Sequence, residues 1–114
     1  MNKPLPEIVP ALRALANPQR ARIMDWLLDP TDHFPPQRDG DLVRDGVCVG
    51  AITDKTKLTQ PTVTSHMKTL ESAGLVTSQK IKNWVFYKAD RTALDQIAQV
   101  FGQAAGSYSP TAYK

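Results

Sequence analysis

The chain has 114 residues, which is enough for one domain with one hydrophobic core and too few for a large enzyme. Hydrophobic residues make up 41% and charged residues 22%, as in soluble globular proteins, and no apolar run approaches the roughly 18 residues of a membrane span. Residues 1–54 hold six basic and eight acidic residues (net −2), whereas residues 55–114 hold eight basic and three acidic ones (net +5). A polyanionic partner is therefore expected to meet the second half.

Two helices are predicted at the N-terminal end. Apolar residues from Leu5 to Leu15 recur at helical spacing and stop before Asn17, which precedes a proline and so resists the helical region. Asn17 is a suitable N-cap and Pro18 suits the first helical position, so a second helix is predicted from Pro18 to about Asp29. Residues 30–46 are rich in proline, aspartate and glycine and predict a long surface loop, a candidate for regulation or partner contact.

A helix-turn-helix is predicted over residues 47–73. A short helix from about 47 to 57 is followed, after a two-residue connection, by a helix over 60–73. Thr59 can cap the second helix and Gly74 stands where a left-handed C-terminal residue is favoured.

A β-hairpin and a last helix complete the predicted fold. β-branched and aromatic residues on either side of a polar Lys82-Asn83 tip predict the hairpin, or wing. Asp90 can cap a final helix over about 91–105, and residues 106–114 are predicted to be a disordered tail. The predicted fold class is mainly α: a winged helix-turn-helix of about five helices and a two-stranded wing, in one domain over residues 1–105.

The predicted helix over 60–73 has two contrasting faces. At 100° per residue, Val63, Met67 and Leu70 form a buried stripe. The other side and its flanks are polar and free of acids, comprising Gln60, Thr62, Ser65, His66, Lys68 and Thr69. Amides and hydroxyls bind base edges and phosphates, and short side chains permit close approach, so this face suits the DNA major groove. A polar helix face alone is more often merely solvated.

The wing adds a second indication of DNA binding. Lys80, Lys82 and Asn83 at its tip are placed to reach a flanking phosphate or the minor groove. Two separate elements therefore favour double-stranded DNA as the partner. A winged-helix module that binds a protein instead of DNA remains an alternative.

The segments DGVCVGAITDKTKLT, QPTVTSHMKTLESAGLV and WVFYK resemble the ArsR (arsenic-repressor-like) family of bacterial regulators. The resemblance spans about Leu5 to Phe101, and the 30–46 loop is longer than the family's usual connection. It implies a homodimer that represses until an inducer lowers its affinity for operator DNA. It also implies that the side chains that read DNA are Gln60, Thr62, Ser65 and His66, with Lys80 and Lys82 serving the wing. Because the family often has glycine where Lys82 stands, Asn83 is expected to adopt the left-handed turn conformation.

Excess apolar surface on the first and last helices predicts the dimer contact. The residues concerned are Leu5, Ile8, Leu12, Leu94, Ile97 and Phe101. A two-fold dimer presents two recognition helices about one DNA turn apart, so the expected operator is an imperfect inverted repeat.

The identity of an inducer stays open at the level of sequence. Metal sensors of this family carry a CxC motif or a carboxylate and histidine set on the last helix, but Gly50 stands where the second thiol belongs and the last helix has no histidine. No metal and no cofactor are therefore predicted. The open alternatives are a small molecule, a redox reaction in which Cys48 is the sensor, a metal held by Asp32, His33 and Cys48 if the loop folds back, and no effector at all.

Neither catalysis nor export is predicted. Cys48, His33 and His66 are the only thiol and imidazole groups and no motif links them, so we expect no enzyme activity. The N-terminal segment lacks an apolar signal core, and a single cysteine fits a reducing compartment. A cytoplasmic protein without a membrane partner is expected.

Overall fold

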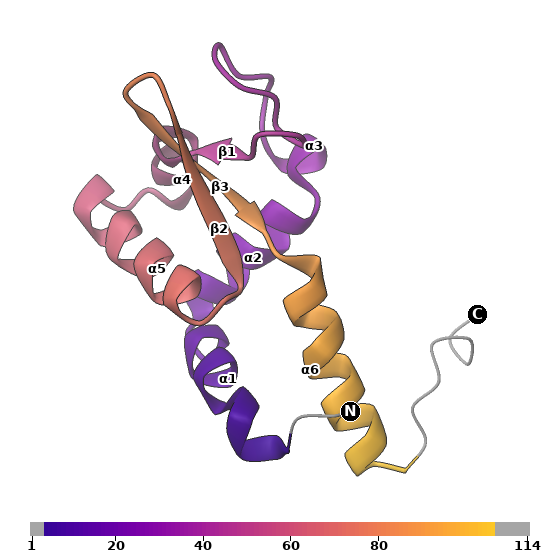
Figure 1. The fold of residues 1–114 in the computed structure, drawn as a ribbon. Coiled ribbons are helices and arrows are strands. Elements are labelled where there is room, and N and C mark those ends of the chain that lie inside the picture. Colours follow the sequence, from indigo (N-terminus) through magenta and orange to yellow (C-terminus); the bar gives the residue numbers. More distant parts are fainter. Residues whose placement is uncertain (1–3, 107–114) are drawn as a thin grey trace.

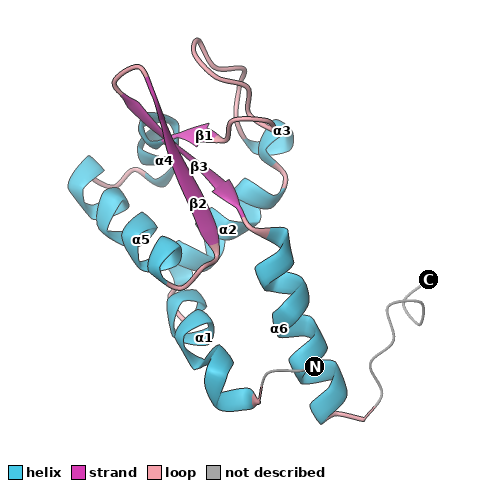
Figure 2. Cartoon of the chain, viewed as in Figure 1, coloured by secondary structure: helices cyan, strands magenta, loops and turns pink. Residues whose placement is uncertain are grey.

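The structure is a computed structural model that describes residues 4–106, in which helices surround a small antiparallel sheet (Figures 1 and 2). The elements in chain order are η1 Leu5–Ile8, α1 Val9–Leu15, α2 Pro18–Leu28, α3 Pro30–His33, β1 Val47–Cys48, α4 Val49–Thr56, α5 Gln60–Ser72, β2 Val76–Ile81, β3 Trp84–Ala89 and α6 Arg91–Ala104. The expected winged helix-turn-helix class is confirmed, although the sheet has three strands instead of two. No helix within residues 4–106 is long and apolar enough to cross a membrane.

Side-chain caps fix the starts of three helices at the predicted residues. Asn17 Oδ1 accepts hydrogen bonds from the backbone N–H groups of Gln19 and Arg20 at 3.0 and 3.1 Å. Thr59 Oγ1 accepts from Thr62 N at 3.4 Å at the start of α5. Asp90 Oδ1 accepts from Ala93 N at 3.2 Å at the start of α6. Each cap satisfies a backbone donor that the first helical turn leaves without a partner.

The first predicted helix is divided into two pieces. A 3₁₀ turn, η1, precedes α1 because Pro10 at the second position of α1 has no N–H and cannot continue a helical ladder from the preceding turn. The second helix ends at Leu28, and Pro30 then opens the short helical turn α3 instead of loop. Proline suits a first helical position, so it both ends one helix and begins the next.

The helix predicted to begin at about residue 47 begins at Val49 in the structure, so the predicted start is wrong. Val47 and Cys48 form β1, which pairs antiparallel with β3 in the register Val47↔Tyr87 and Cys48↔Phe86. The sheet order is β1-β3-β2. The β-branched Val47 is 1% exposed, so packing on the sheet decides its conformation. Cys48 therefore lies in a strand and precedes helix α4 instead of lying within it.

Two turns also differ from expectation. Lys57 adopts a left-handed conformation (φ 63°) and ends α4, so three residues, 57–59, connect the helices. At the wing tip the left-handed residue is Lys82 (φ 56°) and not Asn83, which corrects the sequence-based expectation. Strands β2 and β3 pair up to Ile81↔Trp84, leaving a two-residue turn. A positive φ at the first turn position alone is typical of a type II′ hairpin.

The core lies between α2, α4, α5 and the sheet. The predicted stripe of α5 is confirmed, because Val63, Met67 and Leu70 are each 0% exposed. Other large buried side chains from the surrounding elements are Ile23, Ile52, Leu75 and Phe86. This packing turns the opposite face of α5 toward solvent.

The long loop is held against the sheet and the wing. The Gln37 side chain donates to Gly46 O at 3.0 Å and accepts from Cys48 N at 2.7 Å. The wing residue Gln79 donates to Asp45 O at 2.9 Å, and Lys82 at the wing tip pairs with Asp39 at 2.9 Å. Figure 1 shows this loop and the wing tip at one end of the molecule, opposite the end formed by α1 and α6. The two segments are thus joined at several points.

Candidate nucleic-acid interface

The solvent-facing side of α5 carries the side chains expected to meet DNA. Gln60, Thr62, Ser65, Lys68 and Thr69 are all exposed. Thr62 shares a 2.9 Å hydrogen bond with the hydroxyl of Thr59, and Thr69 Oγ1 donates to Ser65 O at 3.2 Å. Within residues 4–106 the side chains of Gln60, Ser65 and Lys68 make no hydrogen bond, which leaves their polar atoms available to an outside partner.

His66 differs from its neighbours on α5. Its ring is partly buried, and Nδ1 lies 3.2 Å from Arg20 Nη1 on α2. Burial and then the Arg20 charge lower the pKa of His66 below its usual 6.5. A neutral ring with Nδ1 accepting from the guanidinium explains the contact. The same guanidinium is held by a second contact, because Arg20 Nε donates to Ala14 O at 2.7 Å.

Two arginines that the sequence reasoning missed lie beside α5. Arg13 on α1 and Arg20 on α2 line a hollow of about 530 Å³ together with Ser65, Lys68 and Thr69. The net acidic charge of residues 1–54 hid these arginines, because a sum over half the chain says nothing about local placement. Their guanidinium groups extend the basic surface from α5 onto the N-terminal helices.

The wing tip carries two lysines, one of which forms an ion pair with the long loop. Lys80, Lys82 and Asn83 are exposed, as a DNA contact requires. Lys82 Nζ is nonetheless 2.9 Å from Asp39 Oδ1, with side-chain exposures of 71% and 27% for the pair. The wing lysine and the loop carboxylate thus neutralise each other in the unbound protein.

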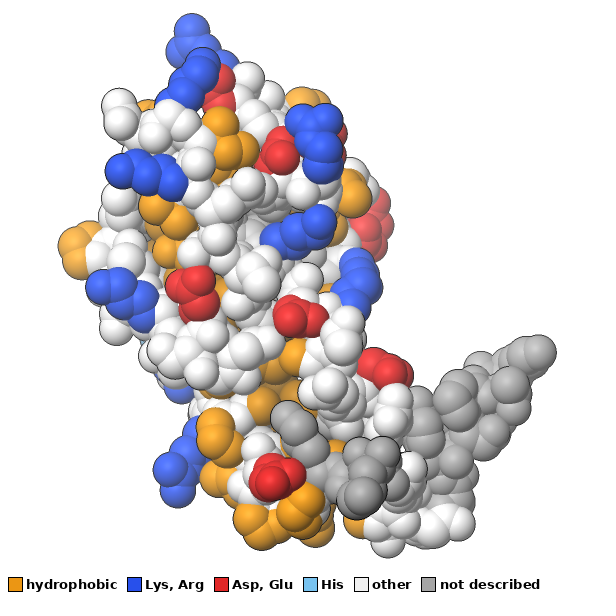
Figure 3. All heavy atoms as spheres, viewed as in Figure 1, with side chains coloured by type: hydrophobic (Ala, Val, Ile, Leu, Met, Phe, Trp, Pro, Cys, Tyr) orange, Lys and Arg blue, Asp and Glu red, His pale blue; other side chains and the backbone are white. Residues whose placement is uncertain are grey.

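The residues expected to form a dimer contact divide into buried and exposed groups. Ile8 is 4% exposed and packs inside one chain, and Leu94 and Ile97 pack against the core. Leu5 and Phe101 are 46% and 47% exposed, and Val9, which the sequence reasoning did not single out, is 36% exposed. Leu12 is intermediate. Figure 3 shows apolar side chains gathered at the lower end of the displayed face, over the N-terminal helices.

Cys48 is partly buried and lies at the junction of β1 and α4. Within the part of the chain that the structure describes, no three side chains of His, Cys, Asp and Glu are grouped closely enough to hold a metal ion. Asp32, His33 and Cys48 thus do not converge, and the loop-based metal site is not supported.

The fold and the polar face of α5 define a winged helix-turn-helix protein of the DNA-binding class. Residues 42–78 match the family model described as bacterial regulatory protein, arsR family. Over 92 residues the chain is 38% identical to the uncharacterized HTH-type transcriptional regulator YbzH of Bacillus subtilis, covering 81% of this chain and 92% of that one. The chain belongs to the arsR family of bacterial regulatory proteins. It is a transcriptional regulator and not an enzyme.

Two solved structures share the fold. HlyU from Vibrio cholerae superposes with a TM-score of 0.64 at 25% identity, covering 91% of this chain and 97% of that one. A winged helix-turn-helix DNA-binding domain from Mycobacterium bovis, described as homodimeric, superposes with a TM-score of 0.61 at 22% identity, covering 89% and 81%.

Proposed function

We propose that the protein is a homodimeric repressor that inserts α5 into the major groove of an operator. The observation that carries this proposal is the exposed face of α5, where Gln60, Ser65 and Lys68 have no partner within residues 4–106. Amide and hydroxyl groups at such positions can bind base edges, and lysine neutralises phosphate. Arg13 and Arg20 beside this face would contact the flanking phosphates.

The wing would bind the DNA backbone next to the major-groove contact. Lys80 is exposed on β2, and Lys82 and Asn83 form the tip. Phosphate contacts by these residues would fix the register of the protein and add affinity for any sequence. Base preference would therefore reside on α5 and general affinity on the wing.

A second copy of the chain is the partner proposed for the apolar end of the molecule. Leu5 on η1, Val9 on α1 and Phe101 on α6 are exposed, and α6 packs against η1 within one chain. The related Mycobacterium bovis domain is described as homodimeric. Two-fold symmetry would place two α5 helices on an imperfect inverted repeat. Such a repressor would act in the cytoplasm, released by a small-molecule or redox inducer.

Fluorescence anisotropy would test the proposal. The purified protein is titrated against its own promoter and a scrambled duplex at several salt concentrations, under reducing conditions. We expect promoter-selective binding that weakens steeply with salt, because phosphate contacts release counterions. Binding to neither duplex would contradict the proposal and favour a protein partner.

Substitutions would assign the roles of individual side chains. Ser65→Ala and Gln60→Ala should reduce the ratio of promoter to scrambled affinity, whereas Lys80→Ala should weaken both duplexes equally. Thr92→Ala, which removes an exposed hydroxyl on α6, is the matched control and should change neither. Equal losses on both duplexes for Ser65→Ala and Gln60→Ala would refute base reading by α5.

A further inference from the structure

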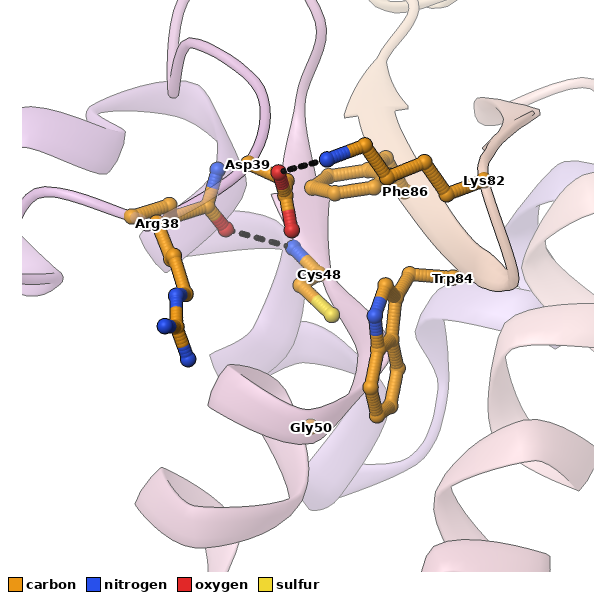
Figure 4. Close-up of a pocket in the computed structure, with 8 residues that line it drawn as sticks. Arg38, Asp39, Cys48, Gly50, Lys82, Trp84 and Phe86 are labelled. Carbon is orange, nitrogen blue, oxygen red and sulfur yellow. Dashed lines mark hydrogen bonds and ion pairs between the residues drawn. The ribbon is translucent and has the colours of Figure 1, made fainter.

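A cavity lies between the long loop, the junction of β1 and α4, and the wing. Its volume is about 590 Å³, within the range of roughly 300–1,000 Å³ that is usual for small-molecule sites. In Figure 4 the guanidinium of Arg38 and the indole of Trp84 stand on either side of Cys48, and Gly50 on α4 lies below them. Loop and wing thus form opposite walls.

Aromatic surface forms one wall of this cavity. Trp84 is 49% exposed, although a large aromatic side chain is usually buried in the absence of a partner. Phe86 also lines the cavity and is 1% exposed. An indole face that is open to a cavity favours a flat, conjugated molecule, since ring faces stack in offset arrangements.

The charges of the cavity favour an anion. Asp39 is the one carboxylate among the lining residues, and Lys82 already pairs with it at 2.9 Å. Arg38 has no carboxylate within salt-bridge distance among residues 4–106, so its charge is uncompensated there. A planar guanidinium binds a carboxylate through two parallel hydrogen bonds.

The floor of the cavity is open because residue 50 is glycine. A Cβ at this position would lie 4.0 Å from Cys48 Sγ, with no other contact, so the space above Gly50 is unfilled. Helix α4 also begins without a side-chain cap, which leaves the N–H groups of its first turn to other acceptors. The missing side chain at residue 50 leaves space for a ligand, and the first turn of α4 offers N–H donors to an anionic group.

We propose that this cavity binds a small aromatic carboxylate, with its ring on Trp84 and its carboxylate on Arg38. Binding lowers the affinity for DNA, because it adds a negative charge to the cavity that Lys82 also lines, and the wing would offer Lys82 to phosphate. The second part of this inference rests on the proposed function, whereas the binding site itself does not. The cavity would then be the inducer site of the regulator.

2-Naphthoate is a suitable probe, with 2-naphthalenemethanol as the neutral aromatic control and cyclohexanecarboxylate as the non-aromatic anion. Isothermal titration calorimetry should show saturable binding of 2-naphthoate and binding at least about tenfold weaker for both controls. Arg38→Gln should weaken the binding of 2-naphthoate by a similar factor and leave the affinity for 2-naphthalenemethanol unchanged. Equal affinity for all three probes would overturn the proposal.

Cys48 reports where the probe binds, because it is the only cysteine of the chain and lines the cavity. Saturating 2-naphthoate should slow its alkylation by iodoacetamide. Gly50→Leu should abolish binding by filling the floor, and it should leave the protein folded, since the position is helical and leucine is a better helix former than glycine. Unchanged binding to folded Gly50→Leu would place the probe elsewhere and overturn the site.

Coupling to DNA is measured separately by anisotropy with the operator duplex. We expect 2-naphthoate to weaken operator binding by wild type and to have no effect on Gly50→Leu, whose affinity without probe should be unchanged. Binding of the probe with no change in DNA affinity would overturn the regulatory part. If the protein binds 2-naphthoate at Cys48 but binds no DNA, the cavity assignment stands and the proposed function fails.

Discussion

Lys82 at the tip of the wing lies 2.9 Å from Asp39 in the long loop, a contact between residues 43 positions apart in the chain. The lysine side chain is 71% exposed, and ion pairs in such surroundings contribute little to stability because water screens them. A DNA phosphate can therefore replace Asp39 as the partner of Lys82. Until it does so, the loop carboxylate competes with DNA for the wing.

Removing that carboxylate should strengthen DNA binding. Asp39→Asn leaves Lys82 without its partner, so we expect affinity to rise about two- to fivefold at low salt, equally on operator and scrambled DNA. The logarithmic salt dependence should steepen by about 0.9 if one phosphate contact is gained. Anisotropy titrations over a salt series would measure both. Asp95→Asn on α6 makes the same charge change away from the wing and should have a smaller effect.

The loop also depends on a glycine at its junction with the sheet. Gly46 has φ 104°, and a Cβ there would lie 2.5 Å from Tyr87 O. Gly46→Ala should lower the free energy of unfolding by about 3 kcal/mol, from backbone strain and a clash with an atom that cannot move independently. Gly74→Ala is the matched control, because its φ is 78° and nothing lies within 4 Å of its Cβ. If urea denaturation shows the same loss of unfolding free energy for both variants, the close approach to Tyr87 O does not destabilise Gly46→Ala.

The elements governed by local signals were predictable. The caps Asn17, Thr59 and Asp90 act through residues two or three positions away, and the stripe of α5 follows from helical periodicity alone. The elements governed by distant pairing were not. Val47 becomes a strand because β3, some forty residues later, offers it an edge.

In the candidate site too, features set by the local sequence were predictable and features set by distant contacts were not. The exposed polar face of α5 follows from the pattern that buries Val63 on the other side. The contacts His66 with Arg20 and Lys82 with Asp39 join residues 46 and 43 positions apart, and no local pattern indicates them. Sequence reasoning therefore found the side chains that face solvent but not the partners that change their chemistry.

His66 should make stability depend on pH. Burial, and to a lesser extent Arg20, lower its pKa in the folded protein. Below pH 6.5 the unfolded chain therefore binds a proton that the folded chain rejects, and the free energy of unfolding falls as the pH decreases from 6.5. Above 6.5 both states are neutral and the contribution vanishes. Urea denaturation at several pH values should show a smaller slope below 6.5 for His66→Gln than for the wild-type protein.

The exposed apolar end of the molecule should control the oligomeric state. Phe101→Glu places a charge in the patch formed with Leu5 and Val9, and a buried unpaired carboxylate opposes association. We expect sedimentation velocity to show a dimer for wild type and a monomer for this variant. Because a monomer contacts one half-site, operator affinity should fall far more than affinity for an isolated half-site. Val43→Glu, at a loop residue that is 56% exposed, is the matched control and should stay dimeric. A Phe101→Glu variant that sediments as a dimer would place the contact between copies on another surface.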